Sequence, residues 1–190
     1  QIMQWDRKNL EGNVTTRGIV PAAQAWVPKL RAEGVDLVVA LSHSGIEALP
    51  QMDDAENASL ALAGVDGIDV VLTGHQHLVF PGEDFAGIEG VDATLGTLNG
   101  KPAVMAGFWG SHMGLVDLLL EREGEGWKIA GHTAEARPIY ERDADKNVVP
   151  LVESVAAVED ATKADHEAAL AYIREKGAPR SEEHTSELQS

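Results

Sequence analysis

The chain has 190 residues with 44% hydrophobic content, no cysteine and a formal net charge of −16 at pH 7. This composition suffices for a packed core, excludes disulfides, and argues against the basic surface that nucleic-acid-binding proteins usually carry. No apolar run approaches the roughly 18 residues of a membrane-spanning helix, so neither a nucleic acid nor a membrane is an expected partner.

The first half of the chain predicts an alternation of helices and strands. Apolar residues recur at helical spacing over residues 19–33, where Pro28 is expected to kink the helix. An apolar run at 35–41 predicts a buried strand, residues 53–63 predict a second helix, and the β-branched run at 68–73 predicts a second strand. This order is typical of parallel strands covered on both faces, and it indicates the α/β class.

The second half predicts antiparallel strands followed by a helix. Residues 81–100 are rich in glycine and lack periodicity, which favours a long surface loop. Strands are predicted at 101–106, 115–121 and 127–134, and the glycines between the last two indicate a tight antiparallel hairpin. Apolar spacing over 149–176 predicts one or two amphipathic helices.

Each of the two predicted parallel strands ends in a loop that contains histidine. SHSG follows the first strand and carries His43, and GHQH follows the second strand and carries His75 and His77. Ligands of α/β sheets lie beyond the carboxyl ends of the strands, so these three imidazoles converge if the strands are neighbours. Histidine is the commonest metal ligand, so the pattern predicts a metal site. Taken singly, each histidine is also compatible with a solvated loop residue or a partner of a backbone carbonyl.

These loops carry a family resemblance. GHQH at 74–77 and LSHSG at 41–45 resemble the last two metal-binding motifs of calcineurin-like metallophosphoesterases. Four further stretches resemble, more narrowly, the bacterial 2′,3′-cyclic-nucleotide 2′-phosphodiesterase/3′-nucleotidases of the 5′-nucleotidase family: AEN at 55–57, FPGEDFAGIEG at 80–90, GTLNGKPAVMAGFWGSHMG at 96–114 and EARPIY at 135–140. The resemblance extends from the first residue to about residue 179.

The resemblance implies a fold, an activity and a set of ligands. The fold is expected to be the C-terminal part of a four-layer α/β/β/α metallophosphoesterase sandwich, followed by a linker helix. The full-length protein is expected to be a periplasmic, monomeric hydrolase of 2′,3′-cyclic nucleotides and 3′-nucleotides, with a nucleotide as substrate. It would use two divalent transition metal ions (Zn, Mn, Fe or Co). By resemblance His43 and His75 bind one ion and His77 binds the other.

Other residues near these motifs receive lesser roles. His112, Asn57 and Glu56 are candidates for groups that orient the metal ligands, although a pairing of His112 with backbone is as compatible with its loop. For Glu56 and Asn57 a polar position on a helix surface is the preferred interpretation. For Phe108 and Trp109 a position in the core is preferred over a role in stacking on a base.

The family also has motifs that this sequence does not contain. Its Asp-x-His, bridging Asp and Asn-His-Glu motifs have no counterpart here, so the bridging carboxylate and the catalytic histidine are expected to lie upstream. No residue of this chain is therefore assigned a catalytic role, and the chain is expected to be inactive alone.

The ends of the chain indicate a truncated reading frame. Residues 1–141 are interpreted as a partial metallophosphoesterase domain without its signal peptide, and residues 142–179 as a linker helix towards a C-terminal nucleotide-binding domain. Residues 180–190, RSEEHTSELQS, resemble the in-frame translation of a sequencing adapter and are excluded from fold reasoning.

Two alternatives remain open. One keeps the enzyme class but takes 5′-nucleotides or another nucleotide as substrate. The other is a non-catalytic α/β binding module whose histidines only form hydrogen bonds, and retention of a metal after dialysis separates it from a phosphoesterase.

Overall fold

The structure is a computed structural model that describes residues 2–50, 52 and 55–177. The chain forms two compact units, Gln1–Leu151 and Val152–Ser190. The first unit contains the sheets and most of the helices, and the second contains the helix α5 (Ala156–Lys176). Among the described residues, no helix combines the length and the apolarity needed to cross a membrane.

The first unit is built on a mixed sheet with the strand order β1-β2-β6-β5-β4, in which β3 also pairs with β6. Strands β1, β2 and β6 are parallel, and β3, β4 and β5 join antiparallel. The strands are β1 (Val39–Leu41), β2 (Val70–Thr73), β3 (Val79–Phe80), β4 (Val91–Asp92), β5 (Thr97–Leu98) and β6 (Lys101–Ala106). This arrangement is the mixed α/β fold that the sequence predicts.

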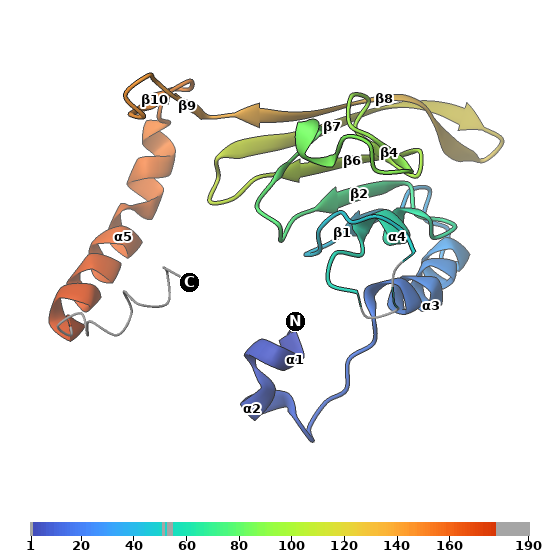
Figure 1. Ribbon diagram of the computed structural model, residues 1–190, viewed down its shortest axis with the longest axis horizontal. Helices are drawn as coiled ribbons and strands as arrows, with labels where there is room; N and C mark the ends of the chain where they lie inside the picture. The colour runs from blue at the N-terminus through green and yellow to red at the C-terminus, as the bar shows by residue number, and fades with distance from the viewer. Residues whose placement is uncertain (1, 51, 53–54, 178–190) are drawn as a thin grey trace. The chain divides into compact units, whose positions relative to one another are not determined.

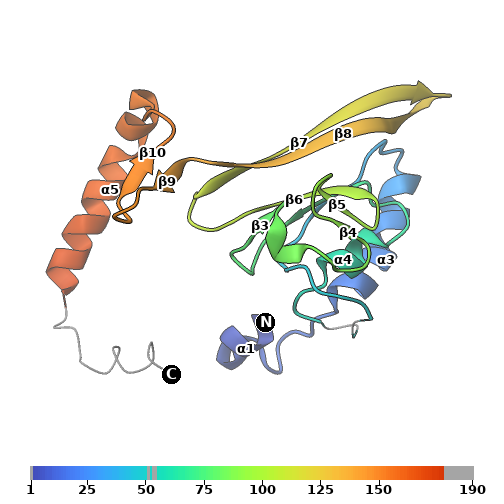
Figure 2. The same ribbon diagram turned by 45° about the horizontal axis from the view of Figure 1, so that its top comes forward.

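Helices and a long hairpin cover the two faces of this sheet. Helices α3 (Ile19–Ala32) and α4 (Ser59–Ala63) lie on one side, and the hairpin of β7 (His112–Glu123) and β8 (Gly126–Pro138) lies on the other (Figure 1). The hairpin runs across the main sheet and projects past its strands (Figure 2). Gly114 permits the close approach, because an added Cβ would meet Val104 of β6 at 3.0 Å.

The core lies between α4 and the sheet. Leu60 and Ala63 of α4, Val71 of β2 and Met105 of β6 are fully buried. Burial of a large aliphatic side chain contributes about 1.5–3 kcal/mol, so this short helix is held by packing rather than by its own propensity. The remaining buried members of the cluster are Val27, Val38, Ile46, Leu62, Val65, Ile68, Phe80, Phe85, Leu98 and Ala103.

The two parallel strands are present but shorter than the apolar runs that predict them. Val70 and Val71 of β2 are buried, whereas Val39 and Leu41 of β1 are exposed, so the expectation of a buried strand is wrong for β1. The amide of Val38 donates a hydrogen bond of 2.7 Å to Oδ2 of Asp69, and this carboxylate also pairs with the guanidinium of Arg31. The amide of Val38 thus bonds to a side chain, while its carbonyl accepts the amides of Asp69 and Val70, and β1 begins at Val39. The same contacts anchor α3 to the start of the sheet.

The helix predicted at 53–63 is also shorter than expected. Backbone groups just before it form hydrogen bonds with distant parts of the chain instead of with the helix. The amide of Ala58 donates to Oγ of Ser44 at 2.7 Å, and Ala58 forms an isolated bridge with Ile46. The helix therefore begins at Ser59. Residues 53 and 54 lie outside the described part of the chain.

The predicted strands of the second half of the chain are all present, and the structure contains further strands that were not predicted. Strand β6 has the predicted bounds, and β7 and β8 form the predicted antiparallel hairpin with longer strands. The predicted loop at 81–100 contains β4, β5 and a 3-10 turn (Glu83–Phe85), so the expectation of irregular structure is wrong there. Asp92 explains the β4–β5 hairpin, because its Oδ1 accepts the amides of Thr94 and Leu95 at 3.0 and 2.8 Å.

Short elements outside these layers complete the described part. Helices α1 (Ile2–Trp5) and α2 (Arg7–Leu10) precede α3, and strands β9 (Tyr140–Arg142) and β10 (Val148–Pro150) form a separate antiparallel pair. In the second unit the single helix α5 agrees with the helical spacing of 149–176, beginning later than predicted. The adapter-like residues 180–190 lie outside the described residues.

Candidate metal centre

The loops after β1 and β2 bring two imidazoles together. The strands are parallel neighbours with Leu41 opposite Leu72, so both loops leave from the same edge of the sheet. Nε2 of His43 lies 3.4 Å from Nδ1 of His75, and their ring centroids are 5.3 Å apart. The expected proximity of these two histidines is confirmed.

The loop that carries His43 is held in place by Ser44, which is fully buried. Its Oγ donates to the carbonyl of Glu56 at 2.5 Å and accepts the amide of Ala58 at 2.7 Å. Its carbonyl accepts a hydrogen bond of 2.9 Å from Oγ of Ser59 and another from Oγ1 of Thr73. Ser44 thus ties the His43 loop to α4, to β2 and to the segment that carries Glu56.

The two histidine loops also interlock through Gly45. A Cβ added at Gly45 would overlap the amide group of Gln76 and Oδ1 of Asn57. The side chain of Gln76 uses this space to accept a hydrogen bond of 2.7 Å from the amide of Ile46. The glycine of the SHSG motif is therefore required by the close contact between the loops.

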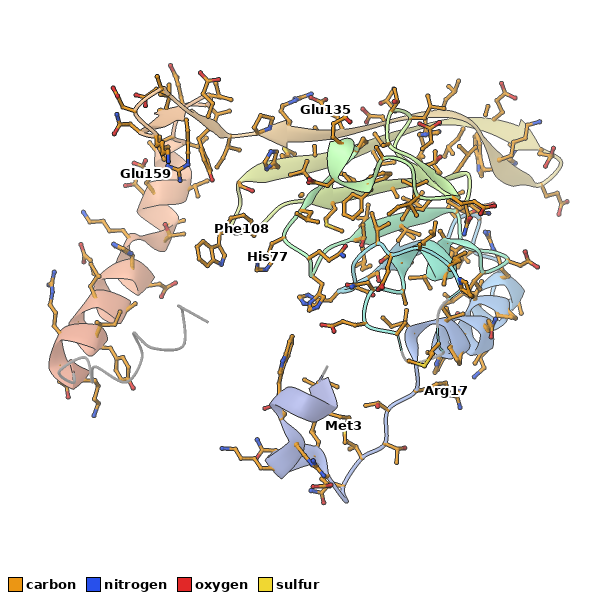
Figure 3. The ribbon with its side chains drawn as sticks, in the orientation of Figure 1. Met3, Arg17, His77, Phe108, Glu135 and Glu159 are labelled. Carbon is orange, nitrogen blue, oxygen red and sulfur yellow. The ribbon has the colours of Figure 1, made fainter. Side chains whose placement is uncertain are left out.

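The GHQH loop is sharply bent. His75 and His77 have φ values of 71° and 61°, in the left-handed region that non-glycine residues rarely adopt. Such conformations cost about 1–3 kcal/mol each and persist only where the surroundings impose them. The bend separates the two rings: His75 meets His43, whereas His77 stacks on Phe108 with a centroid distance of 5.2 Å and an interplanar angle of 20° (Figure 3).

A carboxylate adds to the histidine pair. Oε1 of Glu56 lies 2.7 Å from Nε2 of His75, whose side chain is only 17% exposed. When the Glu56 carboxylate accepts a hydrogen bond from Nε2–H, the lone pair of Nδ1 is directed towards His43, which is how carboxylates orient metal-binding imidazoles. Glu56 precedes α4, so its preferred interpretation as a helix-surface residue is wrong, and the contact agrees with the alternative of an orienting group.

The pair fits two ligands of one metal ion. Two nitrogens, each about 2.0–2.1 Å from a tetrahedral ion, lie about 3.3 Å apart. The observed separation of 3.4 Å between His43 and His75 agrees with that value. Among the described residues, however, no group of three or more His, Cys, Asp or Glu side chains is placed to hold an ion.

The remaining candidates make contacts of their own. His112, at the start of β7, has its Nδ1 2.9 Å from Oγ of Ser111. Asn57 lies against Gly45, and its Nδ2 donates to Oε2 of Glu47 at 3.4 Å. Their assignment as orienting groups, like that of His77 as a metal ligand, stays a prediction.

An open cavity of about 810 Å³ adjoins the pair. Trp5 of α1 extends towards it, with its ring 6.2 Å from that of His75. The lining residues are Ile2, Met3, Trp5, Thr16, Arg17, Gly18, Ile19, His43, Ala55 and Glu56.

Comparison with known proteins identifies homologues for nearly the whole chain. It is 44% identical over 173 residues to the 2′,3′-cyclic-nucleotide 2′-phosphodiesterase/3′-nucleotidase of Salmonella typhimurium, and 47% identical over 148 residues to that of Yersinia enterocolitica. These alignments cover 91% and 78% of this chain but 26% and 23% of the relatives. The chain thus spans about a quarter of the length of the curated relatives it matches. No protein-family profile matches it.

A solved structure supports the same relationship. The calcineurin-like phosphoesterase YfkN from Bacillus subtilis superimposes with a TM-score of 0.81 at 39% sequence identity. The superposition covers 92% of this chain and 50% of that one.

Proposed function

Since the chain is homologous to part of bacterial 2′,3′-cyclic-nucleotide 2′-phosphodiesterase/3′-nucleotidases and has the fold of a calcineurin-like phosphoesterase, we propose that it provides one half of a phosphoesterase metal centre. The reaction is the hydrolysis of 2′,3′-cyclic nucleotides and 3′-nucleotides, as the names of these relatives state for them. A nucleotide is the substrate, and the complete enzyme is a periplasmic monomer.

The observation that carries this proposal is the geometry of His43 and His75. Their facing nitrogens are 3.4 Å apart, and the second nitrogen of His75 lies 2.7 Å from Glu56. A carboxylate behind an imidazole fixes its tautomer and raises its basicity as a ligand. Bound pairs of divalent ions generate a nucleophile from water and neutralise the phosphoryl oxygens in phosphate-ester hydrolysis.

The residues of this chain then have distinct roles. His43 and His75 hold one ion, Glu56 orients His75, and His77 contributes to the second ion. The imidazoles select Zn, Mn, Fe or Co over Mg and Ca, because nitrogen ligands suit transition metals. The stack of His77 on Phe108 limits rotation of that ring.

Two metal ligands, His43 and His75, do not complete a catalytic site. A bridging carboxylate and a residue that assists the departing oxygen are also required, and the sequence contains neither the Asp-x-His nor the Asn-His-Glu motif. The metal centre therefore needs groups from a further part of the enzyme, and this chain binds a metal weakly without turning over substrate.

A second candidate function has a specific observation in its favour. A separation of 3.4 Å between ring nitrogens is also compatible with a direct hydrogen bond between His43 and His75. In that case the chain is a non-catalytic module. Substrate identity is a separate alternative, because 5′-nucleotide hydrolysis would use the same metal ligands.

Metal titration separates these candidates. We expect Zn²⁺ or Mn²⁺ to bind the purified chain in calorimetry, and His43→Ala and His75→Ala each to weaken binding by about tenfold or more. His166→Ala is the matched control, because His166 lies on α5 in the second unit. Equal affinity of the wild type and of both site variants would refute the metal proposal in favour of the hydrogen-bonded pair.

A further inference from the structure

The last residue of β2 joins the two histidine loops. Thr73 lies two positions before His75, and its hydroxyl donates a hydrogen bond to the carbonyl of Ser44. Ser44 directly follows His43, and the amide of Gly74 donates to the same carbonyl at 3.2 Å. The end of β2 thus holds the backbone of the loop after β1 at a point next to a proposed metal ligand.

Two further hydroxyls extend this contact. Oγ of the fully buried Ser59 lies 2.8 Å from Oγ1 of Thr73 and 3.1 Å from Oγ of Ser42. The same Oγ donates to the Ser44 carbonyl at 2.9 Å. Each hydroxyl carries a single proton, so three protons serve four contacts, and no bond of the set is independent of the others. We call Ser42, Ser59 and Thr73 the hydroxyl cluster.

His43 and His75 are positioned by different means. Glu56 lies 2.7 Å from Nε2 of His75 and orients that ring directly. The side chain of His43 is exposed, so its place 3.4 Å from His75 depends mainly on the backbone of its loop. The hydroxyl cluster holds that backbone at the Ser44 carbonyl.

We propose that Thr73 is a positioning residue of the metal centre, whose hydroxyl sets the separation between His43 and His75 through the Ser44 carbonyl. The inference rests on the proposed function, because this separation matters only if both imidazoles hold one ion. Ligand groups must stay within about 0.5 Å of the geometry that a site requires. A loop released from Thr73 would no longer keep His43 at that distance from its partner.

The strand itself does not require this hydroxyl. Thr73 ends the apolar run at 70–72, and valine suits a β-strand as well as threonine does. Valine also has the branched shape of threonine without its hydrogen-bond donor. In a Thr73→Val variant the Ser44 carbonyl keeps the hydroxyl of Ser59 and the amide of Gly74, so it retains partners. The variant is therefore expected to fold.

Calorimetric titration of the full chain with Zn²⁺ tests this inference by comparing Thr73→Val with Thr73→Ser. Thr73→Val should weaken binding by about tenfold or more, the loss typical of a missing partner behind a metal ligand. Thr73→Ser should keep most of the affinity, because serine restores the hydroxyl. The matched control is Thr97→Val, which should bind Zn²⁺ as the wild type does. Thr97 is only 8% exposed on β5, and β6 lies between β5 and β2.

Thermal unfolding with and without Zn²⁺ separates positioning from a general contribution to stability. An ion that binds the folded chain raises its unfolding temperature according to its affinity. A residue with only a structural role changes the unfolding temperature but leaves the Zn²⁺-induced rise as it is. Thr73→Val should reduce this rise, whereas Thr97→Val should not.

The outcomes distinguish this inference from the proposed function. Wild-type affinity and a wild-type rise in Thr73→Val, or an equal loss of affinity in Thr73→Val and Thr73→Ser, overturn the role of the hydroxyl while the proposed function stands. Absence of Zn²⁺ binding by the wild type refutes both. If Thr73→Val does not fold, Ser59→Ala decides, because it removes the hydroxyl that bonds to Thr73. A loss of about tenfold in that variant supports the inference, and unchanged affinity overturns it.

Discussion

Glu56 and His75 form a carboxylate–imidazole pair with a separation of 2.7 Å between Oε1 and Nε2. The second ring nitrogen of His75 faces His43, so the carboxylate acts on the imidazole that is proposed to bind the metal. Their side chains differ in exposure, 58% for Glu56 and 17% for His75, so the pair lies at the rim of the site. This relationship leads to the first prediction.

Glu56→Ala should weaken Zn²⁺ binding by about tenfold to a hundredfold, because loss of an orienting partner typically lowers metal affinity by that much. Competition with a chelator of known affinity measures the effect. Glu83→Ala, in the 3-10 turn away from the histidine loops, is the matched control. Unchanged affinity in Glu56→Ala would show that the pair has no part in metal binding.

Gly45→Ala should destabilise the chain by about 1–3 kcal/mol, because its new methyl group overlaps Gln76 and Asn57 in a packed site. Urea unfolding with and without the substitution gives the difference in free energy. Gly74→Ala is the control, since nothing lies within 4 Å of a Cβ at Gly74. A loss equal in the two variants would contradict the proposed interlock.

The metal-loaded chain should release no phosphate from adenosine 3′-monophosphate and should not open adenosine 2′,3′-cyclic monophosphate. The reason is that the proposed centre has His43 and His75 as ligands and Glu56 as their orienting group, but no bridging carboxylate. Phosphate assay and chromatography of the products measure turnover. Hydrolysis that disappears in His75→Ala would prove the prediction wrong, whereas hydrolysis that persists in that variant indicates a contaminant.

The turn between β9 and β10 should open at low pH. Hydrogen bonds from the side chain and amide of Asn147, and from the amide of Asp145, lower the pKa of Asp143 below its ordinary value. A carboxyl group with a lowered folded-state pKa stabilises the folded turn above the ordinary aspartate pKa, and this contribution is lost as the pH falls through the lowered pKa. The exposed position of Asp143 makes the effect local.

Amide hydrogen exchange at Asn147 measures this opening. Protection should fall below the ordinary aspartate range in the wild type. In Asp143→Asn it should be low at every pH, with no such step. A step that survives in Asp143→Asn would assign the effect to another group.

The sequence was sufficient to predict the parallel strands and the meeting of His43 with His75. Short apolar runs rich in β-branched residues identify strands, and parallel neighbours leave their sheet at one edge. The neighbouring helix was predicted too long because the amide of Ala58 bonds to Ser44, a contact that depends on tertiary structure. No sequence pattern indicates that a side chain will take the hydrogen bond of a backbone amide that would otherwise belong to the helix.

The sequence named Glu56 as one possible orienting group but favoured a surface position for it, and it favoured a core position for Trp109, which is 93% exposed. A polar residue near a helix start is usually a surface group, and a Phe-Trp pair is usually in the core. Glu56 is brought to His75 by the bonds of Ser44, and Trp109 is directed outward by the bonds of Ser111. Each outcome depends on a different buried serine, Ser44 in the first case and Ser111 in the second.

Strand β1 affects how this chain behaves in concentrated solution. Among the described residues it pairs with β2 on one side only, and its side chains Val39 and Leu41 are 47% and 80% exposed. A strand edge with apolar side chains can recruit a strand from another molecule. At low ionic strength the net charge of −16 opposes such contacts, and added salt shortens the range of that repulsion. Self-association of the purified chain should therefore increase with salt, and a lysine at position 41 should suppress it.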